Sequence, residues 1–85
     1  MHRATEQFWQ RYRDLSPGVQ DHADKAFALL RQVHRHPSLH FKKVGAFWSA
    51  RVDRTHRVLA VEDGGDLIWA WIGSHDEYER IIQAR

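Results

Sequence analysis

The chain has 85 residues, 42% of them hydrophobic, and a formal net charge of +2. This length supports one domain with a small core, so we expect residues 1–85 to fold as a single unit. The sequence has no cysteine, no long apolar run and no apolar N-terminal segment, which argues against a disulfide framework, a membrane partner and a signal peptide and favours a cytoplasmic protein.

A short edge strand at residues 2–5 and then a helical hairpin are expected first. Thr5 and Ser16 are suitable N-caps for two helices, and Pro17 occupies the first helical position, which proline favours. The second helix should end at His36, because a residue that precedes proline disfavours helical geometry. Apolar residues at helical spacing are expected in the core: Phe8, Trp9, Tyr12 and Leu15, then Val19, Ala23, Ala26, Phe27, Leu30 and Val33.

The pattern then changes to that of strands, expected at 39–44, 47–52, 56–62 and 67–72. Residues 53–55 form a tight turn, and residues 63–66 (DGGD) are a strong hairpin signal. In the last strand, the residues at odd and at even positions are both apolar, so both faces of this strand should be covered by other parts of the protein. Ser74 and Glu77 match a capping box for a final helix to about Ala84, docked by Ile81 and Ile82. The fold class is α+β, with a helical hairpin on a small, about four-stranded antiparallel sheet plus a short C-terminal helix.

Charge is distributed unevenly. Residues 31–57 contain seven Lys or Arg and one acid, whereas residues 60–79 contain six acids and no Lys or Arg. A basic middle segment is typical of a surface that binds phosphate groups, although charge runs are often only solvated surface.

Four segments follow the hairpin in a specific order: residues 37–43 (PSLHFKK), 48–52 (WSARV), 56–59 (HRVL) and 69–78 (WAWIGSHDEY). From about Arg3 to Ile82 the chain thereby resembles the RelE/ParE superfamily of type II toxin–antitoxin toxins. The resemblance implies helices packed on an antiparallel sheet and a cognate antitoxin that wraps the toxin. It further implies cleavage of messenger RNA in the ribosome for the RelE branch, or inhibition of DNA gyrase without catalysis for the ParE branch.

The resemblance also suggests site residues. Arg57 matches the arginine of the middle strand, and Arg51 matches a basic residue of the preceding strand. His75 falls where RelE-branch toxins carry a cationic or imidazole side chain after the last strand. Tyr78 resembles a C-terminal aromatic residue at a different offset, and Lys42 and Lys43 lie one strand earlier than the matching lysines.

The proposed chemistry can be argued from the residues themselves. Cleavage of RNA by its own 2′-hydroxyl needs a base, a cation beside the phosphate and an acid for the leaving oxygen, and it requires no metal and no other cofactor. His75 is suited to be the acid, and Arg57 and Arg51 to clamp the phosphate. The sequence does not choose among the candidate bases, which are His56, Glu77 and Tyr78.

Lys42, Lys43 and Arg54 are further expected contacts to nucleic acid. The two lysines are adjacent on a strand, so at most one of them faces a given cleft. Arg57 has a structural alternative, an ion pair with Asp53 or Glu62, and Tyr78 has a packing role as its alternative.

Two other patterns are interpreted as structural. His34, His36 and His40 suggest zinc, but without cysteine and with scattered placement we expect no metal site. The tryptophans are expected to lie in the core or to contact an antitoxin rather than to stack nucleobases. They are Trp48, Trp69 and Trp71.

We therefore expect a cytoplasmic toxin that cleaves messenger RNA on the ribosome, with catalytic residues His75, Arg57 and Tyr78 and with an antitoxin as protein partner. The alternatives are a gyrase-binding toxin and a non-toxic interaction module. The nuclease interpretation requires that Arg51, Arg57 and His75 converge on one pocket.

Overall fold

A computed structural model describes residues 2–32 and 36–84, and the predictions for Val33 and His34 lie outside this part. Three helices surround one sheet, with the bounds α1 (Glu6–Arg13), α2 (Pro17–Gln32) and α3 (His75–Ala84). The strands are β1 (His2–Ala4), β2 (Lys42–Val44), β3 (Phe47–Arg51), β4 (His56–Asp63) and β5 (Asp66–Ser74), and a 3₁₀ turn, η1 (Pro37–Leu39), precedes β2.

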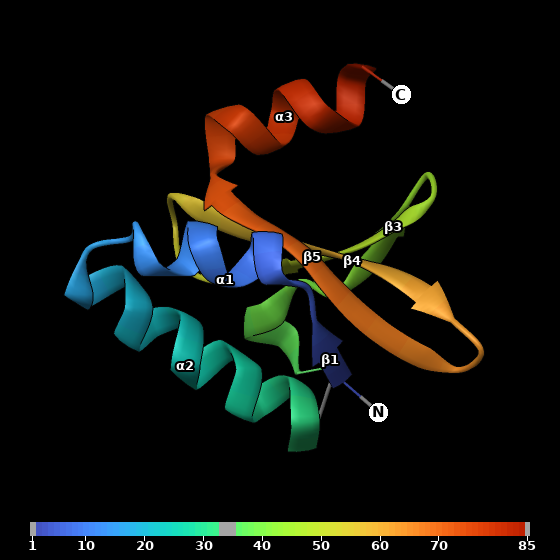
Figure 1. Cartoon of the computed structure of the whole chain (residues 1–85), viewed down its shortest axis with the longest axis horizontal. Coiled ribbons are helices and arrows are strands. Elements are labelled where there is room, and N and C mark those ends of the chain that lie inside the picture. The colour runs from blue at the N-terminus through green and yellow to red at the C-terminus, as the bar shows by residue number, and fades with distance from the viewer. Residues whose placement is uncertain (1, 33–35, 85) are drawn as a thin grey trace.

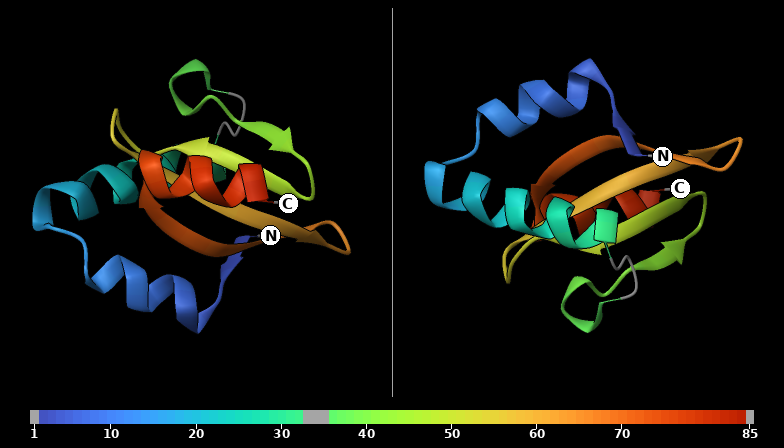
Figure 2. Two further views of the ribbon diagram at one scale, coloured as in Figure 1. Left: turned by 90° about the horizontal axis from the view of Figure 1, so that it is seen from above. Right: turned by 90° about the horizontal axis from the view of Figure 1, so that it is seen from below.

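The sheet has the strand order β1-β5-β4-β3-β2, in which β1 is parallel to β5 and the other neighbours are antiparallel. The α+β class is confirmed, with five strands in place of about four, because the short N-terminal strand joins the sheet. Figure 1 shows α1 and α2 on one side of the sheet and α3 on the other. The two views in Figure 2 show α3 crossing one face, α2 crossing the opposite face and α1 running beside the β5 side of the sheet.

The helix starts are confirmed. Oγ1 of Thr5 accepts a hydrogen bond from the Phe8 N–H at 3.1 Å and caps α1. Oγ of Ser16 accepts one from the Val19 N–H at 3.4 Å, and Pro17 begins α2. Each cap satisfies a backbone donor that has no partner within its helix.

The main core lies between the helical hairpin and the sheet. Phe8 and Leu30 from the helices pack with Val58, Trp69 and Ile72 from the central strands, and each of these side chains is almost fully buried. Their burial stabilises the fold, because removal of apolar surface from water is favourable.

Trp9 was expected in the core and is instead 42% exposed. It follows Phe8, which takes the core position, and its indole packs edge-on against Phe8 and Tyr12 at the surface. A helix as short as α1 offers only a narrow stripe to the sheet, so the second of two adjacent aromatics faces away from the core.

A β-bulge changes the expected faces of β5. Leu59 pairs with Trp71, whereas Ala60 pairs with Trp69, so Ala70 is an extra residue without an opposite partner. Trp69 therefore points into the core under the helices, and Trp71 lies on the face of Leu59. Coverage of β5 on both faces is confirmed, and the bulge places Trp69 and Trp71, which strict alternation would put on one face, on opposite faces.

The strand expected at 39–44 begins only at Lys42. Leu39 ends η1 and is buried in the core, and His40 adopts a left-handed backbone conformation with φ 46° and ψ 42°. The left-handed residue interrupts the extended conformation, which is why the strand is shorter than the apolar pattern predicts.

The start of α3 is fixed by the predicted capping box. The Glu77 N–H donates to Oγ of Ser74, and Oε1 of Glu77 accepts from Ser74 in return. Arg11 donates from Nε to the Ile72 carbonyl at 2.8 Å and from Nη2 to Oε2 of Glu77 at 3.0 Å. Hydrogen bonding from the Ser74 backbone, with help from Arg11, holds the pKa of Glu77 below its usual value. Arg11 thus ties α1, the edge of β5 and α3 together.

The turn between β3 and β4 is organised by Asp53. Its carboxylate contacts Nδ1 of His22 at 2.9 Å and Nδ1 of His56 at 3.2 Å, and it accepts a hydrogen bond from the Thr55 N–H at 2.8 Å. Burial by itself would raise the pKa of Asp53, but these hydrogen bonds outweigh it and hold that pKa far below its ordinary value. The turn is thereby attached to α2.

Within residues 2–32 and 36–84, no helix combines the length and the hydropathy needed to cross a membrane.

Substitution of Gly73 tests how tightly the side chains pack at the end of β5. A Cβ there would lie 2.5 Å from Cζ2 of Trp71 and 3.0 Å from a guanidinium nitrogen of Arg11. Because the indole is rigid, we expect Gly73→Ala to lower the free energy of unfolding by about 1–3 kcal/mol in urea denaturation. Gly18→Ala is the matched control: its Cβ meets nothing within 4 Å, and it should leave stability unchanged or raise it by about 0.4–1 kcal/mol. Equal stability of the two variants would contradict this packing.

The role of Asp53 in the β3–β4 turn can be tested through the pH dependence of protein stability. Because folding depresses its pKa, the charged carboxylate contributes stability above its ordinary pKa of 3.8, and this contribution is lost as pH falls below that value. Asp53→Asn should therefore be less stable than the wild type at pH 7 and should lose less stability between about pH 5 and pH 2. Urea midpoints from circular dichroism measure this, and parallel pH curves for the two proteins would refute it.

Candidate active site

A pocket of about 170 Å³ lies between α3 and the sheet, on the face opposite the helical hairpin. Its walls come from four parts of the chain that are distant in sequence: the η1–β2 junction, β3, the start of β4, and α3. The lining residues are His40, Lys42, Val44, Ser49, Arg51, Arg57, His75, Tyr78, Glu79 and Ile82. Arg51, Arg57 and His75 therefore share one pocket, as the nuclease interpretation requires.

The two arginines are direct neighbours across the sheet. Arg51 of β3 and Arg57 of β4 form a register pair, so their side chains leave the same face side by side. Nη1 of Arg57 donates to the main-chain oxygens of Asp53 at 2.6 Å and His56 at 2.8 Å, and Nε of Arg51 donates to the Asp53 oxygen at 3.3 Å. The expected alternative, an ion pair of Arg57 with a side-chain carboxylate of Asp53 or Glu62, is replaced by these carbonyl contacts.

Two adjacent guanidinium groups repel each other. Burial, followed by the charge of Arg51, lowers the pKa of Arg57 below its ordinary value. A bound anion would relieve this repulsion, and the planar donors of arginine match phosphate oxygens well. The pair is therefore suited to hold a phosphodiester.

His75 opens α3 at the rim of the pocket. Its N–H donates to the Thr55 carbonyl at 2.7 Å, which ties the helix start to the β3–β4 turn. Nε2 of the ring lies 3.2 Å from Oε1 of Glu79, one helical turn later, and this contact is an ion pair when the imidazole is protonated. The imidazole is partly exposed, so a substrate has access to it.

Tyr78 lines the pocket but is only 4% exposed. Its phenol oxygen accepts a hydrogen bond from Oγ of Ser49 at 3.0 Å, and both side chains are buried. The ring also packs against His75, with centroids 5.9 Å apart. Tyr78 thus anchors α3 to β3 and forms one side of the pocket, which agrees with the packing alternative.

Of the remaining predicted residues, one lines the pocket and the others lie outside it. Lys42 is a lining residue, whereas Lys43 points to the other face, with Nζ 5.7 Å from the centre of the Trp48 ring. Arg54 is exposed in the β3–β4 turn and is not part of the lining. Trp48 packs on the core and donates to Glu62, as expected for a structural tryptophan.

Three polar lining residues were missed by the sequence interpretation: His40, Ser49 and Glu79. Ser49 is two residues before Arg51, and strand alternation places both on one face. Glu79 is four residues after His75 on a helix, a spacing that brings side chains together. His40 is two residues before Lys42, but it was considered only as a metal ligand. Among the described residues, no group of three or more side chains is placed to hold a metal ion.

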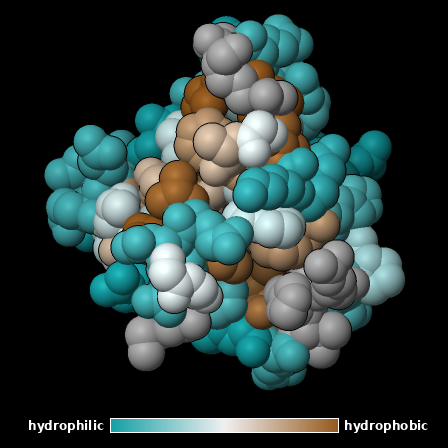
Figure 3. Space-filling view, turned by 90° about the vertical axis from the view of Figure 1, so that its right-hand side faces the viewer, coloured by the Kyte–Doolittle hydropathy of each residue, from teal (hydrophilic) through white to brown (hydrophobic). Residues whose placement is uncertain are grey.

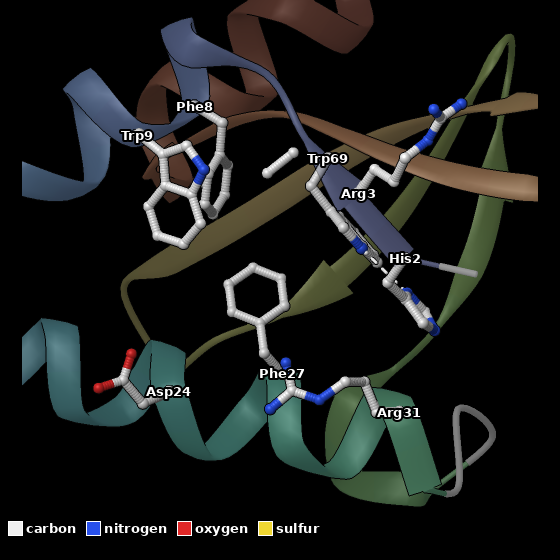
Figure 4. A pocket seen from close by; sticks show the side chains of 9 residues that line it. His2, Arg3, Phe8, Trp9, Asp24, Phe27, Arg31 and Trp69 are labelled. Atoms are coloured by element: carbon white, nitrogen blue, oxygen red, sulfur yellow. Dashed lines mark hydrogen bonds between the residues drawn. The ribbon is translucent and has the colours of Figure 1, made fainter.

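A second cavity, of about 290 Å³, opens on the helical side of the sheet. Figure 4 shows the rings of Phe8, Phe27 and Trp69 around it, with Trp9 and Asp24 at its edges. Asp24 accepts a hydrogen bond from the Tyr12 hydroxyl, and this bond is the main cause of the raised pKa of Tyr12. The cavity contains none of the predicted site residues.

The structure resembles several solved toxins. The toxin fold of the RelB–RelE antitoxin–toxin complex from Methanococcus jannaschii matches with a TM-score of 0.73 and 8% identity, over 93% of this chain and 96% of that one. The isolated Escherichia coli RelE toxin matches with a TM-score of 0.64 and 10% identity, over 100% and 98%. The E. coli DinJ–YafQ complex matches with a TM-score of 0.64 and 14% identity, over 91% and 94%. At these identities the likeness establishes the fold.

Sequence comparison supplies the family. No curated protein sequence matches the chain. Residues 17–80, which include α2, strands β2 to β5 and the first half of α3, match the family model of the ParE-like toxin domain. Together with the fold, this match means that the chain belongs to the ParE-like toxin domain family within the RelE/ParE superfamily of toxins.

Proposed function

We propose that this protein is the toxin of a type II toxin–antitoxin module and that it cleaves messenger RNA on the ribosome without a metal ion. The observation that carries the proposal is the pocket in which two neighbouring arginines, a partly exposed imidazole and a lysine meet. Arg51 and Arg57 hold the scissile phosphate and balance its growing negative charge. His75 protonates the leaving 5′-oxygen, with Glu79 as the positioning residue for its ring.

A cognate antitoxin is the proposed protein partner in the cytoplasm. The M. jannaschii RelE and E. coli YafQ structures were solved as antitoxin–toxin complexes, which supports a similar partner here. Figure 3 shows patches of partly exposed apolar side chains among hydrophilic ones on one face of the molecule. A segment of antitoxin that folds on binding would cover such a surface.

The second candidate is a toxin that binds and inhibits DNA gyrase without catalysis. It is favoured by the match to a family model described as ParE-like. A binding protein of this kind needs the toxin surface but does not need an acid beside a pair of phosphate-binding arginines.

Replacement of His75 separates the two functions. If His75 is the acid, His75→Ala should reduce cleavage of ribosome-bound messages at least tens-fold, because general acids contribute about 10²–10⁴-fold. Cleavage ends mapped on translated messages after induction, together with growth arrest, measure the effect. The antitoxin complex should still form, which controls for folding. A variant that remains fully toxic without cutting messages would favour gyrase inhibition, and harmless wild-type protein at good expression levels would exclude both toxin functions.

Substitutions of the adjacent residues Lys42 and Lys43 form a matched pair that tests whether RNA binds on the pocket side of the sheet. Lys42→Ala removes a charge from the pocket and should lower cleavage several-fold, mainly through KM, and it should weaken the salt dependence of binding. Lys43→Ala removes an identical charge from the Trp48 side and should have a clearly smaller effect. Kinetics on programmed ribosomes at two salt concentrations test this, and equal losses in the two variants would mean that only the overall charge matters.

A further inference from the structure

The residues that the sequence suggested as the base have other hydrogen-bonding roles. His56 contacts Asp53 and Thr55 in the β3–β4 turn and does not line the pocket. Glu77 is held by Ser74 and Arg11 in the capping box. Tyr78 is buried and bonded to Ser49. The pocket nevertheless contains a second imidazole, that of His40.

We propose that His40 is the catalytic base that removes the proton from the 2′-hydroxyl of the RNA. The proposal rests on the nuclease function proposed above and assigns the one catalytic role that this function leaves open.

The sheet aligns Arg51 with Arg57, and the segments next to it bring two imidazoles to the same pocket. Ladder pairing of β2 with β3 begins at Lys42 and Ser49, so His40 lies in the segment that leads into β2, and its side chain lines the pocket together with Arg51. Arg51 pairs with Arg57, and Arg57 pairs with Gly73, which has no side chain. His75 follows Gly73 by two residues. His40, from the segment before β2, and His75, from the start of α3, therefore enter the pocket of the two guanidinium groups from different parts of the chain.

The dimensions suit one phosphodiester. The axes of β2 and β4 are roughly 10 Å apart, since neighbouring strands are spaced by about 4.8 Å. Because His40 and His75 both line a pocket of about 170 Å³ that also holds the two arginines, one phosphate held there can have its attacking and its leaving oxygen within reach of the two imidazoles. This is the layout that acid–base cleavage of RNA requires.

The backbone at His40 is specifically held in this position. Among the described residues, His40 is the one non-glycine residue with positive φ, a conformation that is costly for a side chain with a Cβ and is often found at functional sites. Leu39 is anchored in the core on one side of the sheet, and the left-handed turn carries the next side chain to the pocket on the other side. The His40 N–H donates to the Pro37 carbonyl, and the side chain is exposed to solvent and substrate.

The reaction balances without a further reactant. Neutral His40 takes the 2′-hydroxyl proton, and the 2′-oxygen forms a bond to the adjacent phosphorus. The bond from phosphorus to the 5′-oxygen breaks, and His75 supplies the proton to that oxygen. The products are a 2′,3′-cyclic phosphate and a 5′-hydroxyl, and solvent returns both imidazoles to their starting protonation states.

The first test removes the imidazole and keeps the backbone. Asparagine and glycine both tolerate the left-handed conformation, so His40→Asn and His40→Gly should fold and bind antitoxin as the wild type does. Single-turnover cleavage on programmed ribosomes should fall about 10²-fold or more in both. Added imidazole should restore cleavage by His40→Gly, which a purely structural role would not allow. Wild-type rates in the two folded variants would overturn the proposal.

The second test separates base from acid. A message in which sulfur replaces the bridging 5′-oxygen at the mapped cleavage site releases a thiolate, which leaves without a proton. This substrate should largely restore cleavage by His75→Asn and should not restore cleavage by His40→Asn. The reverse pattern would assign the acid to His40 and overturn its role as base. Wild-type protein that cuts no message would instead refute the nuclease function itself.

Discussion

The geometry of the pocket depends on the turn between β3 and β4. The main-chain oxygen of Asp53 accepts hydrogen bonds from both Arg51 and Arg57, and the Thr55 carbonyl accepts one from the N–H of His75. One short turn therefore fixes both guanidinium groups and the first residue of α3. The carboxylate of Asp53 in turn attaches the turn to α2 through His22. A cationic pair that would otherwise repel is held in place by carbonyl oxygens, which orient the arginines without neutralising them as a carboxylate would.

A second set of contacts determines where α3 lies. The capping box of Ser74 and Glu77 sets its first turn, Arg11 joins that turn to α1, and the buried bond between Ser49 and Tyr78 attaches its middle to β3. These contacts act on the same helix end that carries His75. The β5 bulge contributes as well, because it directs Trp69 into the main core and leaves Trp71 beside Gly73 on the opposite face. The site is thus assembled by polar contacts that span the sheet edge, while the apolar core lies mainly on the other side.

Much of this could be predicted from the sequence because it depends on local chemistry. The caps at Thr5 and Ser16, the Gly64-Gly65 hairpin and the Ser74–Glu77 box are short-range signals, and strand alternation already separated Lys42 from Lys43. The rest depends on tertiary contacts. Pairing of β5 with β4 decides whether Ala70 is an extra residue. The exposure of Trp9 depends on how much of α1 contacts the sheet. The left-handed turn at His40 depends on the burial of Leu39. The polar site residues that were missed are close in sequence to predicted ones, but only the fold shows that they share a pocket with them; they are His40, Ser49 and Glu79.

The two candidate functions make different demands on this architecture. A gyrase inhibitor needs a complementary outer surface, and nothing in such a role explains why two arginines should be paired in register beneath a helix. A nuclease needs fixed cations at the centre and titratable groups on either side, and it needs them accessible to an RNA backbone. The small volume of the pocket, its position at the sheet edge and the exposure of His40 and His75 satisfy that combination. The left-handed backbone at His40 is the further argument, because a side chain with a Cβ adopts this conformation at a cost and such residues are often found at functional sites.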